Sequence, residues 1–305
     1  MADSLKSWPV RSLEEAKALL IAPGAFFEME EISAGGMAMR SWKHAPATLR
    51  ELFLRARGFG SRECLVYEGE RATFEDFARA ALAVAAVLET RGIRSGDRVA
   101  IAMRNLPEWP AVFFGAALAG AVAVPLNAWW SADEIAAALG DCGARVAFAD
   151  AERWGLIEAR RDRIPALEHV FVCGFPGTLG TPIASKLEAA IGRVAGWKRL
   201  PAGRLPSVPL SPDGDAAIFY TSGTVAAPRG VLCTHRNLLS SIMAMGYSLA
   251  RDILRAGGPV PGGHFLDTPQ RSVLLSIPLF HVTGACAVMG PSLFIGAKLV
   301  LMRKW

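Results

Sequence analysis

The segment "FYTSGTVAAPRGV", residues 219–231, decides the fold of this chain. It joins a short apolar run to a second valine through small, hydroxylated and conformationally free residues. Gly223 and Gly230 allow the backbone to turn so that amide groups converge on an anion. The segment therefore predicts either a phosphate-binding loop that follows a strand or an ordinary glycine-rich connection.

The side chains of this segment suit a phosphate group. Thr221, Ser222 and Thr224 offer hydroxyl donors, and the guanidinium of Arg229 matches phosphate oxygens. The chain has no G-x-x-x-x-G-K-[ST] pattern, so the segment is not a Walker A loop. From its composition alone, the phosphate site and the plain connection both remain open.

Length and composition limit the class of protein. The 305 residues suffice for one large domain or two ordinary ones. A content of 52% hydrophobic and 20% charged residues excludes a disordered chain. The net charge of +5 comes without a dense run of lysine and arginine, so we expect no nucleic acid partner. No oligomeric state is predicted.

Cysteine spacing and hydropathy indicate a cytoplasmic protein. The five cysteines are far apart and form no C-x-x-C pair, which favours reduced thiols. The start, "MADSLKSWPV", lacks the apolar core of a secretory signal. Residues 109–130 and 272–297 are apolar but interrupted by proline, so each predicts a buried helix and strand in succession instead of a membrane span.

Strand and helix patterns alternate from residue 64 onward. A hairpin is expected over residues 64–74, with Gly69 at its turn. The other expected strands are 97–103, 121–126, 145–150, 169–174, 216–220, 272–277 and 297–302. The expected helices are 74–91, one opened by Pro107, 131–141, about 235–255, and one after His281. Such alternation predicts an α/β fold, with parallel β-sheets flanked by helices.

Several residues are expected to fix the helix ends. Thr73 and Ser131 begin capping-box patterns, and Gly92 follows the end of a helix. Asn105 lies two residues before Pro107 and is expected to be an N-cap. His235 is expected to help start the helix after the glycine-rich segment.

The chain is expected to divide into four parts. Residues 1–44 form an N-terminal extension, and residues 45–173 form a first α/β subdomain. Residues 174–215, which are rich in glycine and proline, connect it to a second subdomain over residues 216–305.

The opening segment closely resembles the signature loop of the adenylate-forming (AMP-binding) superfamily, which reads [YF]-T-S-G-T-T-G-x-P-K-G-V. The fitting residues are Tyr220, Thr221, Ser222, Gly223, Thr224, Pro228, Gly230 and Val231. His235 and Asn237 follow, as in the family, and "PLFHVTG" over residues 278–284 resembles its P-x-x-H segment. The order of "GDRVAIAMRNLPEW" and "AGAVAVPLNAWW" is similar to that of acyl-CoA synthetases.

The resemblance implies the N-terminal part of the large domain of an adenylate-forming enzyme, which activates a carboxylic acid with ATP and Mg²⁺ and transfers it to CoA. A fatty acid is the expected substrate. His281 would lie beside the reacting carboxylate, and Thr224 would also meet the metal. The residues expected at the ATP phosphates are Thr221, Ser222, Gly223, Thr224, Val225, Arg229 and Gly230.

Three positions of the loop depart from the family pattern. Val225 stands for threonine, Ala226 for glycine and Arg229 for lysine. The chain also stops at "VLMRKW", before the family's ribose-binding and C-terminal segments, which predicts a truncated ligase and leaves its activity open. The alternatives are a non-catalytic remnant that binds an acyl group or a partner, and an unrelated nucleotide-binding α/β domain.

Two further features have a functional and a structural interpretation. His281 is expected to orient the acid, and the alternative is a buried histidine satisfied by the backbone. Trp129 and Trp130 could border a pocket, but core packing at the end of a strand is the preferred prediction.

Overall fold

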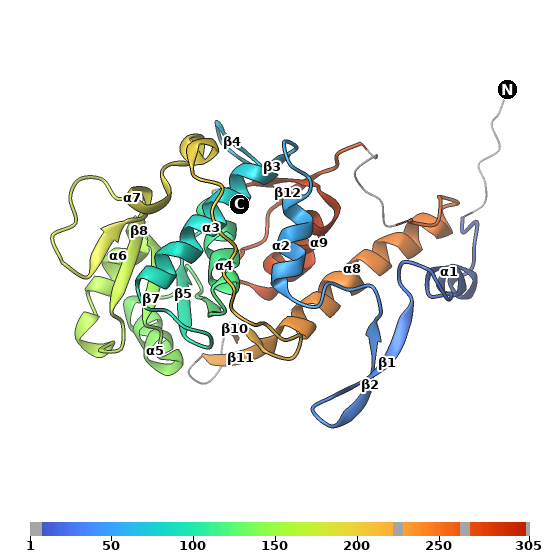
Figure 1. Cartoon of the computed structure of the whole chain (residues 1–305), viewed down its shortest axis with the longest axis horizontal. Helices are drawn as coiled ribbons and strands as arrows, with labels where there is room; N and C mark the ends of the chain where they lie inside the picture. Colours follow the sequence, from blue (N-terminus) through green and yellow to red (C-terminus); the bar gives the residue numbers. More distant parts are fainter. Residues whose placement is uncertain (1–7, 222–227, 263–268, 303–305) are drawn as a thin grey trace.

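The computed structural model describes residues 8–221, 228–262 and 269–302. Within them the strands form a seven-stranded sheet, a four-stranded sheet and a separate two-stranded hairpin. Helices cover both larger sheets (Figure 1). The predicted α/β fold, with parallel sheets flanked by helices, is confirmed.

The seven-stranded sheet has the order β11-β10-β6-β5-β7-β8-β9. Its neighbours are parallel except for β10 and β11, which form an antiparallel pair. The bounds are β5 Arg98–Ala102, β6 Val122–Pro125, β7 Val146–Asp150, β8 His169–Cys173, β9 Ala184–Lys186, β10 Asp215–Thr221 and β11 Arg229–Thr234. All the strands expected here are present. Two strands of this sheet were not expected: β9 comes from the segment expected to be a connection, and β11 comes from the end of the glycine-rich segment.

Both faces of this sheet are buried, as its apolar strands require. In β5, Val99 and Ile101 join the core on one face, while Ala100 and Ala102 join a second core on the other. The first face is covered by α4 (Glu108–Leu118), which packs against α3 (Phe74–Thr90). The second face is covered by α5 (Ala132–Cys142) and α6 (Ala151–Glu158).

The four-stranded sheet has the order β12-β13-β3-β4. Its strands are β3 Glu63–Tyr67, β4 Glu70–Thr73, β12 Ser272–Leu275 and β13 Lys298–Leu301. The hairpin β3–β4 is the one that the sequence predicts. Both sheets therefore take strands from either side of residues 174–215, and the division of the chain at that segment does not separate two sheets.

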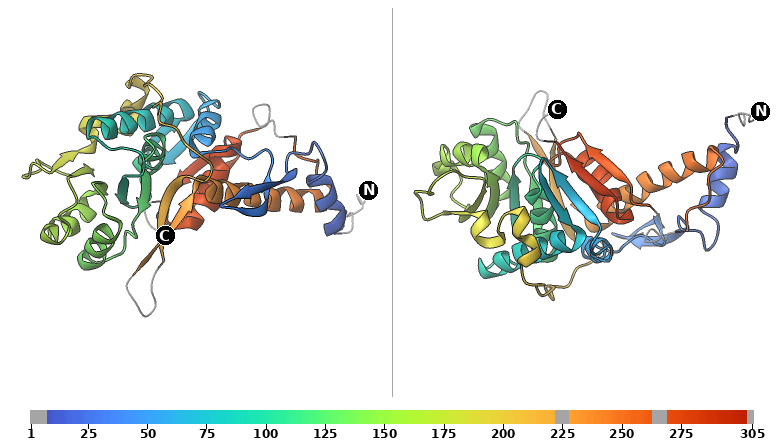
Figure 2. Two further views of the ribbon diagram at one scale, coloured as in Figure 1. Left: turned by 60° about the horizontal axis from the view of Figure 1, so that its bottom comes forward. Right: turned by 90° about the horizontal axis from the view of Figure 1, so that it is seen from above.

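The helix α8 (His235–Arg255) is the longest described helix. One end of α8 packs on the body, and the other end reaches α1 (Leu13–Leu20). The hairpin of β1 (Met29–Ala34) and β2 (Met37–Trp42) projects beside it, as both panels of Figure 2 show. Against the body lie α2 (Leu49–Arg57), a π-helix over Thr283–Met289 and α9 (Gly290–Ile295). Short helical segments are η1 (Arg161–Arg163), α7 (Leu187–Ile191) and η2 (Val194–Arg199).

The caps predicted at Thr73, Ser131 and Gly92 are confirmed. Thr73 and Ser131 each accept a hydrogen bond from the amide three residues later, and the side-chain oxygen of that later residue accepts one from the amide of the cap residue. Gly92 has a φ of 71°, a conformation open to glycine, just after α3. Thr234 and Ser12 cap α8 and α1 in the same way.

Of the two apolar stretches, the first forms buried elements, whereas the strand predicted to be buried in the second is wrong: β12 is the edge strand of its sheet and exposes Ser272 and Leu274. Residues 109–130 contain most of α4 and all of β6, and every residue of both elements is buried. No helix in the described parts of the chain is both long and apolar enough to cross a lipid bilayer. All five cysteines are free thiols, four of them buried.

Candidate functional site

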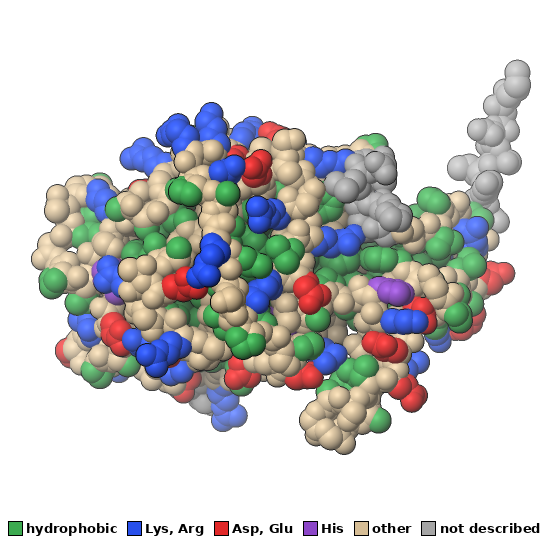
Figure 3. All heavy atoms as spheres, viewed as in Figure 1, with side chains coloured by type: hydrophobic (Ala, Val, Ile, Leu, Met, Phe, Trp, Pro, Cys, Tyr) green, Lys and Arg blue, Asp and Glu red, His purple; other side chains and the backbone are tan. Residues whose placement is uncertain are grey.

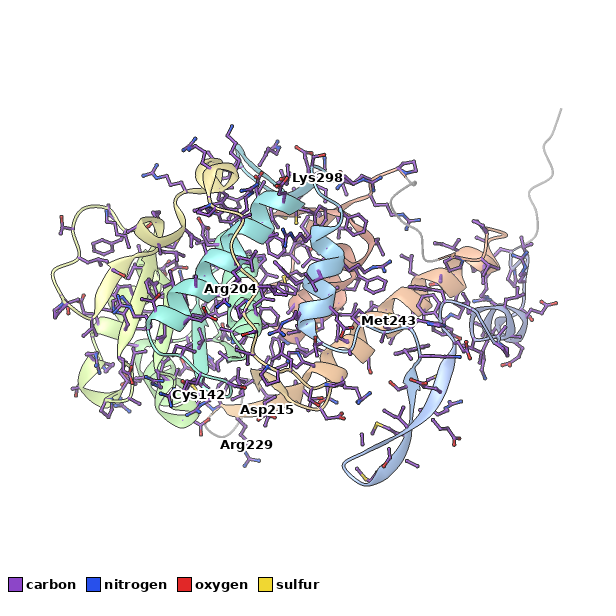
Figure 4. All side chains as sticks on the ribbon, in the orientation of Figure 1. Cys142, Arg204, Asp215, Arg229, Met243 and Lys298 are labelled. Atoms are coloured by element: carbon purple, nitrogen blue, oxygen red, sulfur yellow. The ribbon has the colours of Figure 1, made fainter. Side chains whose placement is uncertain are left out.

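The described residues of the predicted phosphate-binding segment lie where β10 ends and β11 begins, at the last residue pair of this antiparallel hairpin. Thr221 and Arg229 are paired across the hairpin, and the Thr221 hydroxyl donates to the Arg229 carbonyl at 3.4 Å. Both side chains are exposed, and the guanidinium of Arg229 points away from the body (Figure 4). In the described part of the chain Arg229 has no ion pair, so it is available to an anion. Ser222, Gly223, Thr224 and Val225, predicted phosphate or metal residues, lie outside the described residues.

One of the two predicted roles of Gly230, to turn the backbone, is wrong. It does not turn the backbone, because it lies within β11, opposite Tyr220. A Cβ atom at this position would lie 2.8 Å from the Ile218 Cγ2 atom and 3.3 Å from the Tyr220 ring. The residue must therefore be glycine because two side chains of the neighbouring strand β10 approach its backbone closely.

Tyr220 fixes the end of β10. Its hydroxyl donates to the Asp141 carboxylate at 2.5 Å, and its ring meets the Trp130 indole edge to face with centroids 5.7 Å apart. Burial, followed by the nearby carboxylate, raises the pKa of Tyr220 well above its ordinary value. The ring therefore stays neutral and acts as a rigid support for the residues that follow it.

Trp129 and Trp130 point to different partners. Trp130 is 7% exposed and packs on Tyr220, so the prediction of core packing is confirmed for it. Trp129 is 53% exposed, and its indole meets the Phe280 ring edge to face at 5.3 Å, so the same prediction is wrong for it. Two neighbouring indoles thus connect the end of β10 with the residue that precedes His281.

The segment 278–284 forms a compact turn that presents His281. The His281 amide donates to the Pro278 carbonyl at 3.1 Å, and Leu279 is fully buried beneath the turn. The His281 side chain is exposed, which excludes the alternative of a buried histidine. Its Nδ1 atom accepts a hydrogen bond from the Thr283 amide at 3.2 Å, so the neutral ring carries its proton on Nε2.

Gly284 allows this turn to close. A Cβ atom at this residue would lie only 2.1 Å from the Pro278 carbonyl oxygen. The π-helix begins at the preceding residue, Thr283, and such helices are frequent at functional sites. Gly284, the last residue of "PLFHVTG", must therefore be glycine because the backbone of Pro278, the first residue of the same motif, lies against it.

Asn105 does not cap a helix. The N-cap of α4 is Pro107, and Asn105 instead uses its side-chain amide on the turn before His281. Its Nδ2 atom donates to the Ile277 carbonyl at 3.0 Å, and its Oδ1 atom accepts from the Leu279 amide at 2.8 Å. The prediction is wrong because a distant backbone segment supplies better partners than the first turn of α4.

A buried ion pair supports the loops at the carboxyl ends of the central strands. Asp150, at the end of β7, accepts from the Arg104 amide at 3.0 Å and pairs with Arg153 at 3.2 Å. Arg153 is 2% exposed, and its Nε atom donates to the Ala128 carbonyl at 2.8 Å. Sequence analysis missed this pair, although an aspartate at the end of a strand, three residues before an arginine, was a usable signal.

His235 belongs to the scaffold. It is 2% exposed at the start of α8, and its Nδ1 atom accepts from the Leu49 amide at 3.2 Å. Burial, and secondarily the charge of Arg50, lowers the pKa of His235 to about 4. The neutral ring therefore joins the first turns of α8 and α2, in keeping with the predicted structural role.

A cavity of about 620 Å³ lies between α8, α9 and the segments 259–262 and 269–271. Its walls are almost entirely apolar, apart from Gln270 and Arg271. The other lining residues are Phe26, Phe27, Ile242, Met243, Gly246, Leu249, Ala250, Ile253, Pro259, Val260, Pro261, Gly262, Pro269, Pro291, Phe294 and Ile295. On the face seen in Figure 3, hydrophobic side chains are exposed around the far end of α8 and α1.

Within the described residues, histidine, cysteine and carboxylate side chains form no metal site. In residues 8–221, 228–262 and 269–302, no three such side chains lie together. The candidate features are therefore a cationic hairpin end, an exposed histidine and, lined by other residues, an apolar cavity.

Comparison with known proteins gives a consistent result. Residues 52–305 match the family model of the AMP-binding enzyme. The chain is 30% identical over 262 residues to 4-coumarate–CoA ligase 3 of Oryza sativa subsp. japonica, covering 85% of this chain and 42% of the relative. It is 27% identical over 274 residues to the long-chain-fatty-acid–CoA ligase of Bacillus subtilis, covering 82% of this chain and 45% of the relative. The chain thus spans less than half the length of these curated relatives.

Solved structures share the fold. The inhibitor-bound N-terminal domain of FACL13 from Mycobacterium tuberculosis superposes with a TM-score of 0.64 at 27% identity, over 83% of this chain and 57% of that one. The anthranilate CoA ligase AuaEII, solved with anthranoyl-AMP, gives a TM-score of 0.67 over 83% of this chain and 45% of that one. At 24% identity the second likeness concerns the fold alone.

Proposed function

Since the chain belongs to the AMP-binding enzyme family, we propose that it is the acid- and phosphate-binding part of an ATP-dependent ligase that joins a fatty or other apolar carboxylic acid to CoA. The observation that carries this proposal is the link between the two motifs. Through Trp130 on Tyr220 and Trp129 on Phe280, the hairpin end with Arg229 and the turn with His281 are held on one support.

Arg229 and Thr221 suit the phosphate end of the nucleotide. Both are exposed at the open end of β10–β11, and a guanidinium and a hydroxyl can each donate to phosphate oxygens. When bound, ATP would supply the adenylyl group, and CoA would supply the accepting thiol. Thr224 stays the predicted contact for Mg²⁺, together with the predicted contacts of Ser222, Gly223 and Val225.

His281 suits the carboxylate of the acid. With Nδ1 occupied by the Thr283 amide, the Nε2–H group is the remaining donor of the neutral ring. It can donate to one carboxylate oxygen and hold the other oxygen free to react. Such a role is positioning of the reacting group, the main contribution that proteins make to adenylyl transfer.

The cavity supports an apolar acid. Of its lining residues, Pro291, Phe294 and Ile295 lie on α9, which continues the π-helix that starts two residues after His281. A volume of about 620 Å³ falls in the usual range of small-molecule sites. Apolar walls without a matching set of polar groups favour an alkyl or aryl chain over a polar acid.

A second candidate function is a non-catalytic protein that binds the acid or a partner. The apolar cavity of about 620 Å³ supports this candidate equally, because such a pocket can hold the acid without any turnover. Both candidates require the acid site, and only the first requires turnover.

The test is carboxylate-dependent exchange of labelled pyrophosphate into ATP, with Mg²⁺ and a panel of C6 to C16 fatty acids. Arg229→Ala should abolish the exchange, and Arg57→Ala, an exposed arginine at the end of α2, is the matched control. Binding of decanoate by calorimetry separates the two candidates. Binding without exchange supports the non-catalytic protein, and absence of both overturns the acid site itself.

A further inference from the structure

Asn105 is the least expected polar residue of the site. It follows β5 of the seven-stranded sheet and is 2% exposed. Its two hydrogen bonds go to Ile277 and Leu279, which follow β12 of the four-stranded sheet. A single buried amide thus joins the loops of two sheets that share no strand.

Both partners of the Asn105 side chain are backbone groups, so the two hydrogen bonds fix the path of the chain at residues 277 and 279. The Ile277 carbonyl and the Leu279 amide flank Pro278, whose carbonyl accepts the His281 amide. Fixing residues 277 and 279 therefore fixes the start of the turn that ends in His281. The Thr283 amide can then reach the Nδ1 atom and select the ring's tautomer.

Asn105 is itself held on a rigid base. The amide of its neighbour Arg104 donates to Asp150, and the buried Asp150–Arg153 pair also holds the Ala128 carbonyl next to Trp129. Trp129 in turn touches Phe280, one residue before His281. The turn is thus held from its first residues by Asn105 and near its centre by Trp129.

We propose that Asn105 is a positioning residue for the acid: it sets the place and the tautomer of His281 and thereby determines how tightly the carboxylate is held. This inference rests on the proposed role of His281, and it concerns a residue that does not itself touch the substrate. An asparagine is needed because one side chain must both donate to a carbonyl and accept from an amide.

The first experiment reads the His281 ring directly and does not depend on activity. The 305-residue chain labelled with ¹⁵N-histidine is examined by long-range ¹H–¹⁵N correlation, and His281→Gln identifies the signals. In the wild type the shifts should show one tautomer, with the proton on Nε2. In Asn105→Ala they should move toward the average of two tautomers, and in Asn105→Asp, which keeps the acceptor for Leu279, they should move less.

The matched control is Ser185→Ala. It removes one side-chain hydrogen bond, between the Ser185 hydroxyl on the outer strand β9 and the His169 Nε2 atom, at 2.8 Å. This variant should change the His169 signals and leave those of His281 in place. If Asn105→Ala leaves the His281 tautomer unchanged while its melting temperature falls as in the control, Asn105 is only a structural residue and the inference is overturned.

The second experiment measures decanoate binding by the same variants. Loss of two hydrogen bonds that position the donor should weaken the affinity about tenfold in Asn105→Ala. The affinity of Ser185→Ala should equal that of the wild type. If the wild type binds no acid, the proposed function fails, whereas the ring signals still decide whether Asn105 positions His281. Unchanged decanoate affinity in Asn105→Ala overturns the inference about the acid.

Discussion

The indole of Trp130 lies edge to face on the ring of Tyr220, with centroids 5.7 Å apart. The next residue back, Trp129, makes the same kind of contact with Phe280 at 5.3 Å. Because the two tryptophans are adjacent, a shift of one contact moves the other. The loop after β6 therefore couples the strand that carries Thr221 to the turn that carries His281.

This coupling predicts different outcomes for the two tryptophans. Trp130→Ala removes a buried indole and should lower the free energy of unfolding by about 3 kcal/mol. Trp129→Ala removes an indole that is 53% exposed and should lower it by less than about 1 kcal/mol. Decanoate binding should nevertheless weaken in Trp129→Ala, because Phe280 loses its support. Urea unfolding measures the stability loss of each variant, and calorimetry measures its affinity for decanoate. Equal stability losses in the two variants would contradict the prediction.

Gly284 offers a test of the turn. In Gly284→Ala the new methyl group would meet the Pro278 carbonyl, which must move by more than an ångström. We expect a loss of about 3 kcal/mol of stability and faster amide exchange over residues 277–284. Gly155→Ala is the control, since a Cβ atom there meets nothing within 4 Å inside α6. That variant should gain about 0.5–1 kcal/mol. Similar losses in both would show that the turn is not closely packed.

His235 predicts a loss of stability in mild acid. Burial lowers its pKa in the folded state to about 4, below the ordinary 6.5, so the unfolded chain binds the proton more readily. Stability should be unaffected by this group above pH 6.5 and fall as the pH drops from 6.5 to 4, by up to about 3 kcal/mol. His235→Gln keeps an acceptor for the Leu49 amide and should flatten this part of the profile.

The measurement is urea unfolding at steps between pH 7.5 and 4.5. Gly155→Ala changes no titratable group and should keep the wild-type slope. His169, whose pKa burial also lowers to about 4, contributes equally in both variants. An unchanged slope in His235→Gln would contradict the assignment.

Glu108 predicts the opposite dependence. This first residue of α4 is 8% exposed, and burial raises the pKa of its carboxyl to about 7. Because the folded-state pKa lies above the ordinary value of 4.5, the contribution is present below pH 4.5 and is lost as the pH rises through 7. Glu108→Gln should be more stable than the wild type at pH 8 by about 3 kcal/mol, with no difference near pH 4. Thermal unfolding at these two values decides the point, and a destabilised variant at pH 8 would refute it.

Local patterns were sufficient to predict most elements of the two large sheets. The period-two and continuous apolar runs gave the strands, and the caps at Thr73 and Ser131 gave helix starts that the structure confirms. The helix after the glycine-rich segment has the predicted bounds, His235–Arg255. The hairpin β1–β2 was not predicted, because its strands are mostly exposed and carry no apolar alternation.

Candidate site residues could be selected from the sequence where they belong to one consecutive motif. Residues that meet only across the fold could not be selected in this way. Thr221, Arg229 and His281 belong to recognisable motifs. Asn105 was misassigned because a residue before a helix normally caps it, and only the tertiary structure brings Ile277 and Leu279 within its reach. The strand pairing of Gly230 depends in the same way on a neighbour, Tyr220, that local sequence does not reveal.

The pairing of β3 with β13 has a consequence for biosynthesis. Leu65 lies opposite Leu299, so the hairpin β3–β4 leaves the ribosome long before its neighbouring strand has been made. During that interval one edge of β3 is open, and an open edge can pair with another chain. The four-stranded sheet cannot close before β13 has been made, so this long-range pairing prolongs the time during which the open edge of a nascent chain needs protection by chaperones.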